Sequence, residues 1–308
     1  MLSKELYNQF CKKTYVPVFS QPWWLNATCG ADNWNVYVVE NSGALFAAMP
    51  YYIEEKDNYK KITRPINTQN NGVIYNYPSD LKYCSKLDFE ERVLNEIIDF
   101  IESLNIDRYE QQFHYSFTNW LPFYWRGYGQ ILRYTYVIED TSDVALIENN
   151  ISSNMKKNIK KAQKLVTVSE DFTAEKFYRI NKMTFDRQEI AIPYSLDYFI
   201  RINAACKEHN SGKMLFAVDE NNEIHSVAFI VWDEQSVYYL MNGTNPDFKS
   251  SQANALLVYE SIKIASQMGK KFDFEGSVIK QIEKSFRQYG GIQKPYFRIF
   301  KTLKKGEH

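Results

Sequence analysis

The sequence predicts an α+β fold of two similar tandem domains, each a mixed, mostly antiparallel sheet flanked by helices. Two observations predict it. Segments with the alternation of strands and segments with the spacing of amphipathic helices follow one another in the same order in both halves. In addition, residues 125–138 align without a gap on residues 286–299. The identical pairs in this alignment are Arg126 and Arg287, Tyr128 and Tyr289, Gly129 and Gly290, Ile131 and Ile292, and Ile138 and Ile299.

The internal repeat predicts a duplication and a domain boundary. We expect an N-terminal domain over residues 1–142 and a C-terminal domain over residues 143–308, because the polar run at residues 139–143 interrupts the strand pattern. Each copy then has roughly 150 residues, an ordinary domain size.

Composition excludes several classes of protein. Lys plus Arg and Asp plus Glu number 37 each, so the chain has no net charge that would attract DNA or an anionic membrane. The four cysteines stand far apart without CxxC spacing, which argues against a zinc site and a disulfide framework. No apolar run approaches the ~20 residues of a membrane span, and the polar N-terminus does not resemble a signal peptide. We therefore expect a cytoplasmic protein with no metal site.

The first copy begins with a short helix that Pro22 can start. Trp24 on this helix is a candidate ligand contact, although a packing role is the simpler interpretation. The residues Asn41, Ser42 and Gly43 indicate a hairpin turn. Asn70 lies in a polar loop that could line a pocket, although such loops are more often solvated turns. The remaining expected elements are strands at residues 34–40, 44–54, 60–66, 107–113 and 132–139 and a helix at residues 89–104.

The second copy opens with a basic helix that Ser152 or Ser153 can cap. Lys156 and Lys157 are among five lysines on this helix, and they could hold a phosphate or form a solvated face. A helix is expected at residues 173–187, then a meander of strands at residues 214–219, 223–233 and 236–242, a polar loop at residues 243–252, and a helix at residues 253–268.

The last part of the chain carries the most informative pattern. In a strand at residues 271–275, alternation places Asp273 and Glu275 on one face and two phenylalanines on the other. Gly276 allows a sharp turn, and Ser277 is a candidate cap for a short helix that ends with Arg287. Two carboxylates on one face can serve a reaction, but solvated acids at a strand end are an equally good explanation.

These segments together resemble a known family. The order of elements resembles the GNAT acyltransferase fold. Residues 238–277 are similar to the strand, polar loop, helix and D-F-x-G-S strand end of the Fem family, and residues 285–291 (SFRQYGG) resemble its F-K-x-x-F-G motif. Residues 155–162 resemble a basic helix, and residues 19–25 (FSQPWWL) an N-terminal Q-x-x-x-W segment. Tandem copies with these motifs resemble the Fem family (FemABX-like), whose members join aminoacyl groups to peptidoglycan precursors.

The sequence also departs from these families. Arg287 stands where the Fem motif commonly has Lys, and Tyr289 where it has Phe. No glycine-rich phosphate loop precedes the helix at residues 253–268, unlike in acetyl-CoA enzymes of the GNAT type. Residues 25–30 contain no basic side chain, although peptidoglycan enzymes of the family tend to have a Lys there.

The resemblance implies transfer of an acyl or aminoacyl group from an activated donor to an amine. It implies that Glu275, alone or together with Asp273, binds or deprotonates the amine, and that Arg287 holds an anion or polarises the carbonyl. The expected substrate-binding residues are Tyr289, Lys156, Lys157, Trp24 and Asn70.

The donor is expected to be aminoacyl-tRNA or acyl-CoA, acting as a co-substrate with no tightly bound cofactor. The acceptor is expected to be a small molecule or a cell-envelope precursor. Two alternatives stay open: an acetyl-CoA-dependent N-acetyltransferase of an amino sugar or amine, and a non-catalytic binding module on the same fold.

Overall fold

The computed structural model describes residues 3–303, and their contacts divide them into two compact units. Unit 1 contains residues 3–133 and 295–303, and unit 2 contains residues 134–294. This division by contacts does not test the predicted boundary at residues 142 and 143, which stays a prediction. Among the described residues, no helix combines the length and the apolar character that a membrane span requires.

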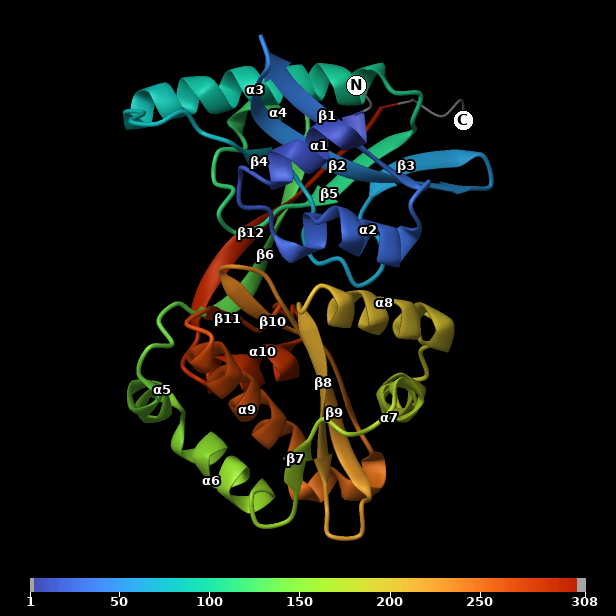
Figure 1. Cartoon of the computed structure of the whole chain (residues 1–308), viewed down its shortest axis with the longest axis vertical. Coiled ribbons are helices and arrows are strands. Elements are labelled where there is room, and N and C mark those ends of the chain that lie inside the picture. Colours follow the sequence, from blue (N-terminus) through green and yellow to red (C-terminus); the bar gives the residue numbers. More distant parts are fainter. Residues whose placement is uncertain (1–2, 304–308) are drawn as a thin grey trace. The chain divides into compact units, whose positions relative to one another are not determined.

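Unit 1 is a mixed sheet with helices packed on it (Figure 1). Its strands lie in the order β1-β2-β3-β5-β12, and β4 pairs with β2. The long helix α3 buries an apolar stripe against this sheet, because its apolar residues recur at helical spacing. The bounds are α1 Ser3–Cys11, α2 Pro22–Cys29, β1 Trp34–Asn41, β2 Ala44–Lys56, β3 Tyr59–Thr63, β4 Ile74–Tyr75, α3 Tyr83–Ser103, β5 Arg108–Gln112, α4 Leu121–Trp125 and β12 Ile292–Thr302.

The predicted hairpin at the start of unit 1 is confirmed. Strands β1 and β2 pair antiparallel, and the turn between them has left-handed backbone at Ser42 and Gly43, with φ of 52° and 82°. Left-handed backbone at both central residues is the geometry of a tight hairpin turn.

The last described strand, β12, belongs by its pairing to unit 1. Residues Arg298–Thr302 pair antiparallel with Arg108–Gln112 of β5. The chain therefore completes the sheet of unit 1 with a strand that follows unit 2 in the sequence.

Unit 2 is a sheet in the order β6-β11-β10-β9-β8-β7, with helices on both faces. Helices α6, α9 and α10 contribute to the apolar core on one face, whereas Phe177 of α7 and Phe199 of α8 pack with Phe216 and Phe229 on the other. The bounds are β6 Gly129–Ile138, α5 Val144–Asn150, α6 Ser153–Ala162, β7 Thr167–Ser169, α7 Ala174–Asp186, α8 Leu196–Glu208, β8 Gly212–Val218, β9 Ile224–Trp232, β10 Ser236–Thr244, α9 Ala253–Gln267, β11 Lys271–Asp273 and α10 Lys280–Arg287.

The basic helix of unit 2 forms as predicted. It is α6, and the Ser152 hydroxyl accepts a hydrogen bond from the backbone N–H of Met155 at 3.3 Å. This bond satisfies one of the free amides at the helix start. The meander before α9 is also confirmed, because β8, β9 and β10 pair antiparallel in sequence order.

Candidate functional site

Strand β11 lies in the sheet of unit 2 and pairs with neighbours on both sides. It pairs parallel with β10 over Ser236–Tyr238 and antiparallel with β6 at Ile138 and Val137. Strand β11 ends at Asp273, whereas β10 continues to Thr244. In the described residues, no strand pairs with β10 on that side beyond Tyr238. The polar groups at the end of β11 therefore lie where the pairing between β10 and β11 ends.

Asp273 is a buried carboxylic acid at this point. Its exposed fraction is 4%, and its Oδ1 accepts hydrogen bonds from the Thr135 hydroxyl at 2.5 Å and from the Glu275 backbone N–H at 2.8 Å. Burial, with a smaller contribution from the negative charges of Asp233 and Glu139, raises the pKa of Asp273 to about 6, although the two hydrogen bonds oppose the shift. A carboxyl group with this pKa can exchange a proton near neutral pH.

The chain turns sharply directly after Asp273, so the predicted strand at residues 271–275 ends two residues early. Glu275 and Gly276 both have left-handed backbone, with φ of 64° and 68°. The physical reason is the capture of the Glu275 N–H by Asp273, which removes that amide from the ladder. A side chain at Gly276 would overlap the carbonyl oxygen of Tyr134. Left-handed backbone at a non-glycine residue is strained, and such strain occurs often at functional sites.

The structure places Asp273 and Arg287 on opposite faces of the sheet. Asp273 and Thr135 lie on one face, because Asp273 pairs opposite Val137 and alternate residues of β6 share a face. Tyr136 lies on the other face, where its hydroxyl donates to Glu283 of α10 at 2.5 Å. Arg287 follows one helical turn later and pairs with Glu283 at 3.5 Å. The register of β6 and β11 therefore separates the Asp273 carboxyl from the Arg287 guanidinium.

Strand β10 has an irregularity close to the end of β11. Its register with β9 shifts between Tyr239 and Met241, so Leu240 has no partner residue in β9. A β-bulge of this kind takes backbone groups out of the regular ladder and re-aims neighbouring side chains, and bulges are frequent beside active sites. Sequence patterns gave no sign of this bulge or of the contact from Thr135 to Asp273.

Three other predicted residues of unit 2 have different environments. Tyr289 is 1% exposed, and its hydroxyl donates to the backbone carbonyl of Ala255 at 3.2 Å. Lys156 is half-buried on α6, and Lys157 is exposed on the same helix. Their predicted roles in substrate binding stay predictions.

The two predicted residues of unit 1 lie in or beside one loop. Trp24 is fully buried, and its indole N–H donates to the Thr68 hydroxyl at 3.0 Å. Asn70 is half-buried in the same loop, between β3 and β4. Their roles in substrate binding also stay predictions.

The loop that carries Asn70 is bonded to the end of β5. The Asn71 backbone N–H donates to the Gln112 carbonyl at 2.9 Å, and the Gln112 side-chain amide donates to the Gln69 carbonyl at 2.6 Å. In unit 1 the chain's own loop thus takes the hydrogen bonds at the end of this strand.

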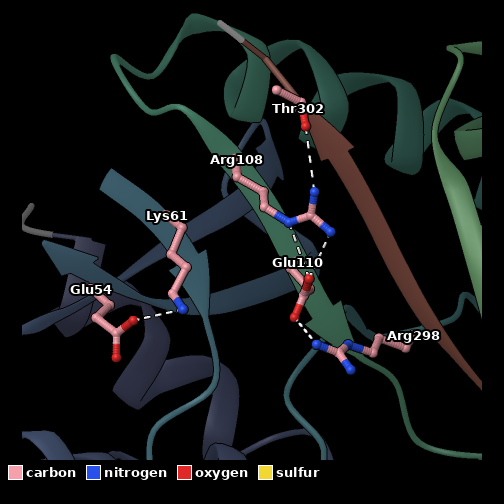
Figure 2. Close-up of polar contacts among 6 residues, drawn as sticks. All are labelled: Glu54, Lys61, Arg108, Glu110, Arg298 and Thr302. Atoms are coloured by element: carbon pink, nitrogen blue, oxygen red, sulfur yellow. Dashed lines mark hydrogen bonds and ion pairs between the residues drawn. The ribbon is translucent and has the colours of Figure 1, made fainter. Parts of the chain in front are cut away.

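Strand β5 also carries an acid that sequence reasoning did not single out. Figure 2 shows Glu110 between two guanidinium groups, those of Arg108 on the same strand and Arg298 on β12. Burial opposes the shift, but the hydrogen bonds from Arg298 and Arg108 lower the pKa of Glu110. The nearby pair of Lys61 and Glu54 spans β3 and β2 at 2.7 Å (Figure 2). Glu110 is thus held in its ionised form by paired charges, in contrast to Asp273.

The start of α9 is a candidate phosphate cradle, because a free helix N-terminus binds anions. The Ser251 hydroxyl accepts a hydrogen bond from the Ala253 backbone N–H at 3.3 Å. Gln252, which precedes the helix, has left-handed backbone, and the segment before it, Pro246–Ser251, forms 3₁₀ turns without glycine. The first turn of α9 therefore does not match a glycine-rich diphosphate loop.

The second half of the chain is similar to a known protein family. Residues 149–278 match the family model described as an acetyltransferase (GNAT) domain. This part of the chain is thus similar to GNAT domains. It includes Asp273, Glu275 and the bulge of β10, whereas Arg287 and Tyr289 lie outside the matched residues. No curated protein sequence matches the chain.

Solved structures extend the similarity to both units. FemX is similar over 96% of each chain, with a TM-score of 0.72 and 12% identity. A tandem GNAT protein from the clavulanic acid biosynthesis pathway matches with a TM-score of 0.53 and 7% identity, covering 89% of this chain and 84% of its own. L-PGS from Bacillus licheniformis matches with a TM-score of 0.52 and 9% identity, covering 98% and 93%.

The comparisons confirm the predicted tandem GNAT fold and the resemblance to the Fem family at the level of the fold. The expected enzyme class agrees with the description of the matching family model as an acetyltransferase (GNAT) domain. The donor and the acceptor do not follow from these similarities.

Proposed function

We propose that the chain transfers an acyl or aminoacyl group from an activated ester or thioester to an amine, at the end of β11 in the GNAT domain. The observation that carries this proposal is the buried Asp273 carboxyl with a pKa of about 6, next to the strained backbone of Glu275. Paired structural acids normally have lowered pKa values, as Glu110 does, whereas an acid that handles protons needs a pKa near the working pH.

The proposed reaction forms one bond and breaks another. The amine nitrogen attacks the acyl carbon, the amine gives up a proton, and the bond from the acyl carbon to the donor's oxygen or sulfur breaks as the leaving group takes a proton. The Glu275 carboxylate binds the amine or accepts its proton. Asp273 positions Glu275 through the backbone hydrogen bond, and its raised pKa allows it to hold the released proton.

The transition state also needs a hydrogen-bond donor that stabilises the negative charge on the acyl oxygen. A backbone amide at the bulge of Leu240 is proposed for that role. The bulge is out of register with β9, and it lies on β10, the strand next to Asp273. Arg287 is proposed to bind an anionic group of the donor or acceptor rather than to share a contact with Asp273, since the two side chains lie on opposite faces.

The start of α9 favours a donor that needs no diphosphate cradle there, such as an aminoacyl-tRNA. The reason is that the Ser251 hydroxyl already accepts a hydrogen bond from the Ala253 backbone N–H. An acetyl-CoA-dependent N-acetyltransferase is the second candidate, and the match to the acetyltransferase family model favours it. The Fem-like fold supports a small molecule or a cell-envelope precursor as acceptor.

Mass spectrometry of reactions that pair a charged tRNA mixture or acetyl-CoA with a panel of amines tests the proposal. We expect an amide product with one donor, and a loss of about 10²-fold or more with Glu275→Gln. Glu220→Gln, at an exposed turn, is the matched control and should retain activity. Absence of product with every donor, in a folded protein, would favour the non-catalytic binding module.

A further inference from the structure

A separate cavity of about 270 Å³ lies on unit 2 beside the basic helix α6. Its walls come from the end of α5, from α6 and from the middle of α9. The residues that matter for its chemistry are Glu148, Ile151, Lys156, Ile159, Lys160 and Tyr259. Of these residues, only Lys156 is among the substrate contacts expected from the sequence, and α6 and α9 belong to the face of the sheet opposite to Asp273.

Two of the five lysines on and directly after α6 line the cavity. Lys156 and Lys160 are four residues apart, so their side chains lie on one face of the helix, and both line the cavity. Lys157 and Lys161 have the same spacing on a neighbouring face, but they do not line it. Lys156 Nζ donates to the Asn149 carbonyl at 3.4 Å. Within residues 3–303, neither Lys156 nor Lys160 forms an ion pair with an acidic side chain.

The remaining walls provide an apolar base and a neutral hydroxyl. Ile151 and Ile159 are 3% and 5% exposed and belong to the core of unit 2. The Tyr259 hydroxyl donates to the Glu148 carboxylate, and burial together with that bond raises the pKa of Tyr259, so the phenol stays neutral. The carboxylate of Glu148 is engaged in this bond, whereas the two ammonium groups have no acidic partner. The cavity therefore has an excess of positive charge.

We propose that this cavity binds the phosphate group of a small phosphorylated molecule through Lys156 and Lys160. Two ammonium groups on adjacent helical turns are close enough to donate charge-assisted hydrogen bonds to one phosphate or diphosphate. The volume is near the lower end of small-molecule sites, which suits a phosphate with a small body and excludes a large ligand held entirely inside. The inference goes beyond the proposed acyl transfer and does not depend on it.

Calorimetric titration of the full chain with inorganic pyrophosphate at low ionic strength tests the site. We expect binding by the wild type, and binding about tenfold or more weaker with Lys156→Gln plus Lys160→Gln. The matched control is Lys157→Gln plus Lys161→Gln, which removes the same charge from the same helix and should change the affinity less than about twofold. Equal weakening by both double variants, or no binding at millimolar pyrophosphate, would overturn the proposal.

The phosphate can come from the acyl donor or from another molecule, and steady-state kinetics of the same variants separates the two sources. A higher KM for the donor with Lys156→Gln plus Lys160→Gln, and not with the control pair, identifies the donor. An unchanged KM together with weaker pyrophosphate binding identifies a different phosphorylated molecule. If both double variants raised the KM for the donor by the same factor, the effect would not be localised at Lys156 and Lys160, and this would contradict the proposal.

Discussion

The Asp273 carboxylate accepts a hydrogen bond from the backbone N–H of Glu275 at 2.8 Å, and the chain turns away from β11 at this bond. The same oxygen accepts the Thr135 hydroxyl at 2.5 Å, so β6, β11 and the turn converge on one buried atom. A change at Asp273 therefore affects the conformation of Glu275 as well as the local charge.

Asp273→Asn should make stability less dependent on pH. The folded chain keeps the Asp273 proton up to about pH 6, whereas the unfolded chain loses it near its usual pKa of 3.8. Between these values the folded state binds more protons, so the free energy of unfolding of the wild type falls as pH rises. Asparagine keeps the accepting oxygen and has no proton to lose. The variant should gain up to roughly 3 kcal/mol on the wild type between pH 4 and pH 6.

Urea unfolding of both proteins at several pH values between 4 and 7 measures this difference. Asp197→Asn, at the exposed Asp197, is the control for the loss of one carboxylate. A constant gap between the wild type and Asp273→Asn would show that Asp273 titrates normally.

Gly276→Ala should destabilise the chain more than Gly269→Ala. The two glycines have nearly equal backbone, with φ of 68° and 65°, but an added methyl group meets nothing within 4 Å at Gly269 and overlaps the Tyr134 carbonyl at Gly276. The left-handed backbone alone costs roughly 1–2 kcal/mol at either site. Thermal unfolding of both variants measures the extra cost of the overlap. Equal losses would mean that the turn relaxes freely, and Gly276 would then not define it.

Local patterns predicted most elements of the fold. The alternation and turn residues of the first hairpin, the capped basic helix and the meander before α9 needed only neighbouring residues, and each of them is present. Helix α8 was missed, because its sequence, LDYFIRINAACKE, has a weaker apolar stripe than α3 and lies between polar segments.

The candidate site was predictable only in part. The sequence singled out Asp273 and Glu275, but it placed them on one strand face, and a side chain that captures a backbone amide overrides strand alternation. The position of Arg287 depends on the pairing register of β11 with β6. This register pairs Phe272 with Ile138 and Asp273 with Val137, which are far apart in the sequence, so local patterns do not encode it.

Arg287→Ala should raise the KM for the substrate that carries the anionic group by about tenfold or more, while the melting temperature stays nearly unchanged. The side chain is 57% exposed and has one ion pair, to Glu283 at 3.5 Å, and such surface pairs contribute little to stability. Lys284→Ala, on the same helix and also exposed, is the matched control and should keep the KM of the wild type. Kinetics and thermal melts of both variants check this. An unchanged KM together with a lower melting temperature would make Arg287 structural.

Tyr289→Phe should separate packing from substrate binding. The ring of Tyr289 packs 5.7 Å from that of Phe274, and the hydroxyl donates to the buried Ala255 carbonyl. Removing the hydroxyl leaves that carbonyl without this partner and should cost about 1 kcal/mol of unfolding free energy. Because only 1% of Tyr289 is exposed, we expect turnover and KM to stay unchanged. Urea unfolding and steady-state kinetics measure the two effects, and a raised KM at unchanged stability would instead support the predicted contact of Tyr289 with substrate.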